Sequence, residues 1–113
     1  MSSDIPPIEV DVYSVSQWLG SRSDFVLVDC REKTEYETCN IAGALLIPMS
    51  LIQSKLDELA KLTNKHIVVH CHHGGRSLRV ANWLRQNGFP TAQSMAGGIE
   101  VWSDEIDPSV PKY

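Results

Sequence analysis

The 113-residue chain lacks a long apolar run, a C-x-x-C pair and an excess of basic charge. No stretch approaches the roughly 18 apolar residues of a membrane span, and no charged-then-apolar leader opens the sequence. Three cysteines without a C-x-x-C pair indicate neither a disulfide framework nor a zinc ribbon. A net charge of −4 argues against nucleic-acid binding. We therefore expect a soluble, cytoplasmic protein with reduced thiols that binds neither a membrane nor nucleic acid.

Acidic residues are missing from one segment, residues 59–99, although the chain as a whole is acidic. This segment holds five Lys or Arg residues and all four histidines, with Cys71 near its middle. Positive potential concentrates small anions and stabilises a thiolate, so the pattern favours an anion site around Cys71. The alternative explanation is that buried strands lack acidic residues in any case, which would produce the same acid-free segment.

Cys71 ends an apolar run and opens a glycine-rich turn. Gly74 and Gly75 allow the backbone to bend sharply, so that its N–H groups point inward. If the amides of residues 72–76 and the N-terminus of the next helix converge on Cys71, they favour its thiolate and make it a nucleophile near neutral pH. The turn therefore predicts an anion cradle around a reactive thiol.

Hydrophobic periodicity predicts strands that alternate with helices. Two runs rich in Val and Ile, 25–29 and 67–70, are typical of strands buried on both faces of a parallel sheet. Further strands are expected near 8–10, 45–47 and 92–95, and helices near 14–19, 32–38, 50–62, 77–87 and 102. This alternation implies right-handed crossovers and an α/β fold, a parallel sheet with helices on both faces.

Two helix starts are marked by serines. Ser14 or Ser16 is the expected N-cap of the first helix, and Ser50 with Gln53 forms a capping-box pair. Apolar residues then recur at helical spacing, which makes 50–62 the most clearly amphipathic helix.

Length and 42% hydrophobic content predict one domain that spans residues 1–113. Residues 1–7 are expected to form a loose lead-in, because they are polar and contain prolines. Residues 104–113 are expected to form an irregular tail that packs back across the domain, since two prolines oppose regular structure there.

Two predicted strands should open on the same rim of the sheet. Asp29 and Arg31 follow one buried strand and Cys71 follows another, and ligands of parallel α/β sheets bind outside the carboxyl ends of the strands. We interpret Asp29 and Arg31 as a neighbouring pair that braces the Cys71 loop. An N-cap role for Asp29 is an equal alternative.

Three motifs, in order, resemble signatures of the rhodanese family in its single-domain form, and the match covers nearly the whole chain. They comprise Asp29–Glu32 with Glu35-Tyr36 and Ile41–Ala44, then Cys71–Ser77, then Met95–Ile99 with Trp102. The resemblance implies a five-stranded parallel α/β fold and a sulfurtransferase whose loop cysteine carries a sulfane sulfur as a persulfide. One departure is Cys39-Asn40, where the family often has Gly-His, and it is expected to affect a surface turn.

The resemblance and the residues together predict a reaction without metal or cofactor. Cys71 would attack the outer sulfur of thiosulfate, or of a persulfide donor, and release it to cyanide or a thiol acceptor. The expected partners are thus a small sulfur-containing anion, a thiol or cyanide, and possible protein sulfur donors or acceptors. The Cys71 loop, His72, His73, Gly74, Gly75, Arg76 and Ser77, is expected to bind the substrate.

Individual loop side chains have separate expected roles. Arg76 offers charge-assisted hydrogen bonds to sulfonate oxygens. His72 and His73 either bind substrate directly or edge the pocket. Cys30 and Cys39 are interpreted as bystanders, with resolution of a Cys71 persulfide into a disulfide as the less favoured alternative.

Three alternative functions involve the same residues. Related cysteine phosphatases use C-x5-R, whereas Arg76 is the fifth residue after Cys71, so the shorter ring favours sulfur over phosphate. A metal site at His70–His73 is disfavoured because adjacent residues point in diverging directions. A carrier module that exchanges sulfur between proteins, with little activity on small molecules, is the main alternative.

Overall fold

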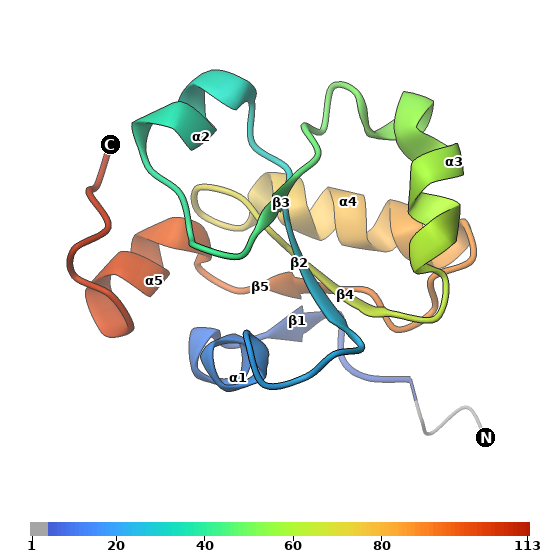
Figure 1. The fold of residues 1–113 in the computed structure, drawn as a ribbon, viewed down its shortest axis with the longest axis horizontal. Helices are drawn as coiled ribbons and strands as arrows, with labels where there is room; N and C mark the ends of the chain where they lie inside the picture. Colours follow the sequence, from blue (N-terminus) through green and yellow to red (C-terminus); the bar gives the residue numbers. More distant parts are fainter. Residues whose placement is uncertain (1–4) are drawn as a thin grey trace.

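The computed structural model describes residues 5–113, and a single parallel sheet of five strands forms its centre (Figure 1). The strand order is β1-β5-β4-β2-β3, and every neighbouring pair is parallel. The strands are β1 (Glu9–Val10), β2 (Phe25–Asp29), β3 (Leu45–Leu46), β4 (His66–His70) and β5 (Gln93–Met95). The predicted α/β class with five parallel strands is confirmed. The expected lead-in at 1–7 falls in part on residues 1–4, outside the described residues.

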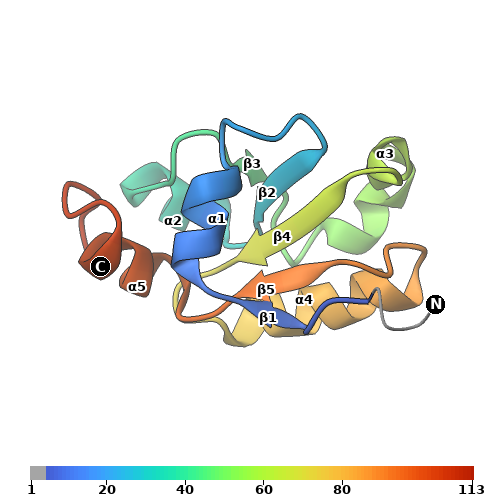
Figure 2. The same ribbon diagram turned by 90° about the horizontal axis from the view of Figure 1, so that it is seen from below.

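Helices cover both faces of the sheet, and Figure 2 shows α1 and α4 on opposite sides of β5. The helices are α1 (Val12–Trp18), α2 (Lys33–Thr38), α3 (Leu56–Leu59), α4 (Gly75–Gln86) and α5 (Gly98–Glu105). One apolar core lies between the sheet and α3 and α4, and a second lies between the sheet and α1 and α5. Within residues 5–113, no helix is long and apolar enough to cross a membrane.

Alternation along β2 and β4 supplies both cores. Leu27 and Val68 pack with α1 and α5, whereas Val28 and Val69 pack with α3 and α4. All four are at most 1% exposed. Because successive strand residues point to opposite faces, a strand buried on both sides must be apolar throughout, which explains the continuous Val- and Ile-rich runs.

The helix expected over 50–62 is present over residues 52–62, but only its middle turn is α-helical. The segment winds as a 3₁₀-helix (η2, Ile52–Lys55), the short α3 and a second 3₁₀-helix (η3, Ala60–Leu62). The Ser50 hydroxyl donates to Glu32 Oε1 (2.9 Å) and caps nothing. Of the apolar stripe, Ile52 and Leu59 are buried while Leu56 is exposed. Packing against the sheet therefore does not enforce a regular helix.

Helix ends also differ from the prediction. Asp11, and neither serine, is the N-cap of α1, because its carboxylate accepts from Ser14 N–H (2.8 Å). Helix α4 begins at Gly75, two residues earlier than expected. Helix α5 continues to Glu105, so the irregular tail begins at Ile106.

The end of β5 leads through a glycine pair that packs directly on the Cys71 loop. Gly98 has φ +62°, and a Cβ built on it would lie 2.4 Å from His72 O and 2.6 Å from Cys71 O. The loop carbonyls are held from the same side, since Ile99 N–H donates to Cys71 O (2.9 Å). Only glycine allows this close approach in the left-handed region.

Replacing Gly98 should therefore destabilise the domain more than an ordinary positive-φ glycine does. Gly98→Ala is expected to lower the free energy of unfolding by about 3 kcal/mol, since strain and a backbone clash add. Gly20→Ala is the matched control, because Gly20 has φ +84° but nothing within 4 Å of a built Cβ. Its expected cost is about 1 kcal/mol from strain alone. Equal losses in urea titrations of the two variants would contradict the close packing.

Candidate active site

Cys71 lies at the carboxyl end of β4, in a loop that donates hydrogen bonds to its sulfur. Gly74 N–H donates to Sγ at 3.1 Å and Ser77 N–H at 3.4 Å, while the Ser77 hydroxyl oxygen lies 3.4 Å away. Gly74 has φ +118°, which turns its amide inward. The expected cradle of residues 72–76 is thus built from Gly74 and extends to Ser77, in the first turn of α4. The helix dipole adds to the same positive field.

These donors hold Cys71 as a thiolate. The pKa of Cys71 is lowered to about 4, first by a hydrogen bond from the Cys30 thiol and then by the Ser77 hydroxyl and the Ser77 and Gly74 amides. Burial opposes the shift, because Cys71 is only 2% exposed. The thiolate form therefore predominates at neutral pH.

Cys30 is the partner thiol, and it lies directly beside Cys71. It is 0% exposed, and its own pKa is strongly raised, first by the hydrogen bond to Cys71, then by burial and by repulsion from Cys71 and Asp29. The pair is thus polarised, with the proton on Cys30 and the charge on Cys71. Cys30 was expected to be a bystander at a strand end, whereas its side chain makes the largest contribution to the thiolate.

Arg76 is turned toward an acid from a different part of the chain. Its guanidinium forms a two-pronged ion pair with Glu35, Nη1 to Oε1 at 2.7 Å and Nη2 to Oε2 at 2.9 Å. Arg76 first, and the Tyr113 hydroxyl less, hold the pKa of Glu35 down to about 2, although partial burial opposes this. Part of the expected positive charge of the loop is therefore offset by Glu35.

An open pocket lies over Cys71 at this rim. Its lining combines the Cys71 sulfur with two imidazoles of the loop and two guanidinium groups of α4. These residues are Cys71, His72, His73, Gly75, Arg76 and Arg79. A small anion that enters the pocket meets the sulfur with positive charge around it.

Asp29 and Arg31 form a buried ion pair beneath this rim. Arg31 Nη2 lies 2.7 Å from Asp29 Oδ2, and both side chains are 0% exposed. Arg31 also donates to Cys39 O (2.7 Å) and to the Tyr113 hydroxyl (2.9 Å). The alternative N-cap role of Asp29 is wrong, because Glu32 is the N-cap of α2.

A chain of contacts connects this ion pair to the active-site loop. The hydroxyl of Tyr113 accepts from Arg31 and donates to Glu35 Oε2 at 2.8 Å, and Glu35 holds Arg76. Tyr113 also stacks on His72 at 4.0 Å between ring centroids. The tail therefore packs back across the domain at the rim of the active site.

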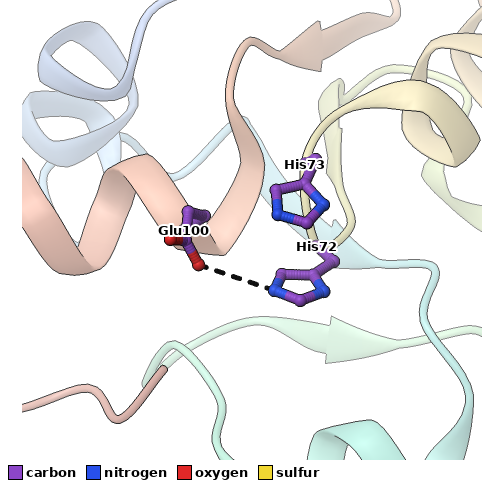
Figure 3. A group of neighbouring side chains, drawn as sticks. All are labelled: His72, His73 and Glu100. Carbon is purple, nitrogen blue, oxygen red and sulfur yellow. Dashed lines mark ion pairs between the residues drawn. The ribbon is translucent and has the colours of Figure 1, made fainter. Parts of the chain in front are cut away.

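His72, His73 and Glu100 form a cluster beside the loop, drawn in Figure 3. Their possible ligand atoms all lie within 4.8 Å of one another, so the expectation that adjacent side chains diverge is wrong for these two histidines. The two rings stack at 3.9 Å with planes 18° apart, however. Ring nitrogens bind a metal along the ring plane, so stacked rings do not aim at one ion. Lys112 Nζ also lies 3.5 Å from Glu100 Oε2 and competes for it.

Four side chains at the site lie outside the expected loop and its Asp29–Arg31 brace: Cys30, Glu35, Arg79 and Tyr113. Glu35 and Tyr113 lie 41 and 78 positions from the residues they contact at this rim, Arg76 and Glu35. Nothing local in the sequence signals such pairs. The sequence did contain a signal for Cys30, because Cys30 directly follows one buried strand and Cys71 directly follows another. That signal places the two cysteines together only if the two strands are known to pair.

The fold and this loop define an α/β domain with a cysteine at the carboxyl edge of its parallel sheet, in a loop whose amides donate to the sulfur. A family model, the rhodanese-like domain, matches residues 12–105. The chain therefore belongs to the rhodanese-like family.

Relatives agree with this assignment. A protein of Allochromatium vinosum named "Sulfurtransferase" is 35% identical over 95 residues, which cover 84% of this chain and 87% of that one. The human single-domain sulfurtransferase TSTD1 superposes with a TM-score of 0.77 at 26% identity, covering 88% of this chain and 98% of the other. Other relatives are much longer. The chain spans 30% of the chloroplastic rhodanese-like/PpiC domain-containing protein 12 of Arabidopsis thaliana, at 36% identity over 77% of this chain.

The role of the Cys30 thiol predicts a shift in the titration of Cys71. Cys30→Ala removes a hydrogen bond to a charged group, worth about 1.5–3 kcal/mol, and should raise the pKa of Cys71 by about one to two units. Cys30→Ser keeps a donor and should titrate closer to wild type. The measurement is the rate of Cys71 alkylation against pH, which should fall in wild type only as the pH approaches about 4. Identical profiles for wild type and Cys30→Ala would refute the hydrogen bond.

Breaking the buried ion pair should cost far more than breaking an exposed one. Arg31→Met leaves the Asp29 carboxylate buried without its partner, and we expect a loss of about 3–5 kcal/mol in the free energy of unfolding. Lys55→Met is the control, because the Lys55–Glu58 pair is exposed and its loss should cost at most about 1 kcal/mol. Urea titration measures both, and a small loss for Arg31→Met would show that Asp29 does not depend on Arg31.

Proposed function

We propose that this domain is a sulfurtransferase in which Cys71 takes a sulfane sulfur from thiosulfate or a persulfide and passes it to cyanide or a thiol. The single observation that carries the proposal is the Cys71 sulfur at the base of a pocket lined by Arg76 and Arg79, where the Gly74 and Ser77 N–H groups donate to it at 3.1 and 3.4 Å. The names of relatives such as the Allochromatium vinosum protein support the same reaction class.

Loading of Cys71 is a displacement at sulfur. The thiolate attacks the outer sulfur of thiosulfate, a new S–S bond forms, and the old S–S bond breaks with its electron pair on sulfite. With a persulfide donor, the leaving group is the donor thiolate instead. The outer sulfur of the product carries negative charge, and inward-facing amides such as those of Gly74 and Ser77 suit such an anion.

The same hydrogen-bond donors assist the second step, in which the outer sulfur leaves Cys71. Cyanide or a thiolate attacks the outer sulfur, and Cys71 leaves as a thiolate. A leaving thiol of low pKa departs faster, so the hydrogen bonds that lower the pKa of Cys71 speed this second step. The low pKa therefore serves both halves of the reaction.

The other rim residues have supporting roles in this proposal. Arg79 lines the pocket and attracts the sulfonate of thiosulfate, while Arg76, whose two Nη atoms are paired with Glu35, adds positive potential at the rim without gripping the sulfonate. His72 is stacked against Tyr113 and edges the pocket. The buried pair beneath them, with Arg31 reaching Tyr113, positions the rim without touching the substrate.

Phosphate-ester hydrolysis is the less suitable activity for this loop. The loop arginine stands one residue closer to the cysteine than in C-x5-R phosphatases. Both guanidinium prongs of Arg76 are engaged by Glu35, so the arginine is not free to grip a phosphoryl group. The short cradle suits a single sulfur atom better.

A carrier function is the second candidate, and one observation favours it. The chain covers only 24% of relatives from Arabidopsis thaliana and Mycobacterium tuberculosis whose names combine adenylyltransferase with sulfurtransferase. Domains like this one are thus parts of longer proteins, in which a neighbouring protein surface could supply or take the sulfur. Cys71 would carry the persulfide in either case.

Thiocyanate formation from thiosulfate and cyanide tests the proposal. Wild type should turn over, Cys71→Ala should fall to the uncatalysed rate, and Cys39→Ser should stay close to wild type because Cys39 lies outside the pocket. Loading from a protein persulfide but not from thiosulfate would favour the carrier function. Hydrolysis of aryl phosphates without any sulfur transfer would overturn the proposal.

A further inference from the structure

Cys30 and Cys71 occupy equivalent positions on two paired strands. Asp29 of β2 is the register partner of His70 of β4, and Cys30 N–H continues the ladder by donating to His70 O at 3.0 Å. Both cysteines lie in the core on the α3 and α4 side of the sheet. Neighbouring strands are about 4.8 Å apart, and disulfides join Cα atoms about 4.4–6.8 Å apart. The two sulfurs can therefore bond without a change in the sheet.

The two sides of the Cys71 sulfur face different surroundings. The pocket that admits substrate is lined by Cys71 and by residues that follow it, and Cys30 is not among them. Cys30 is 0% exposed and packs in the same core cluster as Cys71. An outer sulfur added from the pocket would thus lie on the side of Cys71 Sγ away from the core in which Cys30 is packed. Displacement at sulfur requires the attacking and leaving sulfurs on opposite sides of the sulfur that is attacked.

We propose that Cys30 resolves the Cys71 persulfide: it attacks Cys71 Sγ, expels the outer sulfur as sulfide and leaves a Cys30–Cys71 disulfide. The inference rests on the proposed function, because it needs a persulfide on Cys71. It adds a second activity to the site, the release of sulfide when no external acceptor takes the sulfur.

The step balances without an external oxidant. A Cys30–Cys71 bond forms and the persulfide bond breaks, with its electron pair on the outer sulfur. That sulfur is reduced to sulfide and takes the proton that Cys30 gives up, while the Cys30 sulfur is oxidised. A dithiol reductant then opens the disulfide and restores both thiols, so each cycle converts one sulfane sulfur to sulfide.

Loading of Cys71 also switches the reactivity of Cys30. In the empty site the Cys71 thiolate accepts a hydrogen bond from Cys30 and repels a second negative charge, which keeps Cys30 protonated and inert. Once Cys71 Sγ is the inner sulfur of a persulfide, it no longer carries that charge. Burial and Asp29 still oppose ionisation of Cys30, so resolution is slow and competes only when acceptors are scarce.

Mass spectrometry of thiosulfate-treated protein, without cyanide or added thiol, tests the inference. Wild type should first gain the mass of one sulfur, then lose it, release about one equivalent of sulfide and show a Cys30–Cys71 cross-linked peptide. Cys30→Ser keeps a hydrogen-bond donor but no nucleophilic sulfur, so it should load and retain the added sulfur. Cys39→Ser is the matched control and should form the cross-link, since Cys39 packs in the other core.

The outcomes separate the two proposals. Loading of wild type and Cys30→Ser with equal persistence of the added sulfur, and no cross-link, overturns the resolving role while the proposed function stands. No loading of either protein overturns the proposed function and the resolving role together. The cross-link and the released sulfide are measured on wild type, so the inference can be refuted even if Cys30→Ser folds poorly.

Discussion

The buried thiolate of Cys71 is the constraint on which the rest of the site depends. A negative charge that is 2% exposed is costly unless donors surround it, and the chain supplies four donors from three segments. Cys30 comes from the neighbouring strand, the Gly74 amide from a left-handed turn, and Ser77 gives its hydroxyl and amide from the start of α4. Ser77 is itself tied to Ser94 of β5 by a 2.7 Å hydrogen bond. Pairing of β2, β4 and β5 is therefore a condition for the reactivity of the sulfur.

A second, outer layer of charge sets the shape of the pocket. Asp29 and Arg31 are buried as a pair, Arg31 reaches the hydroxyl of Tyr113, and that hydroxyl reaches Glu35, which holds Arg76. This series connects the carboxyl end of β2 to the loop after β4 through the last part of the chain. An acid from outside the acid-free segment, Glu35, thus pairs with a cation inside that segment, Arg76. The pocket is less cationic than the sequence of that segment implies, and its arginine is oriented.

The sequence was most informative where one residue pattern determines the structure. Strands buried on both faces need apolar residues throughout, so β2 and β4 could be predicted, and the cysteine loop could be placed between β4 and α4. The prediction was only partly right over 50–62, where an apolar stripe suggested a regular α-helix but the segment is mostly 3₁₀-helix and only part of the stripe is buried. It also missed Glu35 and Tyr113, because their contacts join distant segments. The position of Cys30 after a buried strand could be predicted, but its role follows from the pairing of β2 with β4, which sequence alone does not establish.

In the proposed mechanism the two thiols provide two routes for the sulfur. External acceptors would take it from the pocket side, whereas Cys30 would displace it from the core side. The central claim, that Cys71 carries the sulfane sulfur, is tested most directly with thiosulfate, or a small persulfide, labelled on its outer sulfur. The account predicts the label on Cys71 in peptide maps and its removal by cyanide as labelled thiocyanate. Label on another residue, or none on the protein, would contradict it.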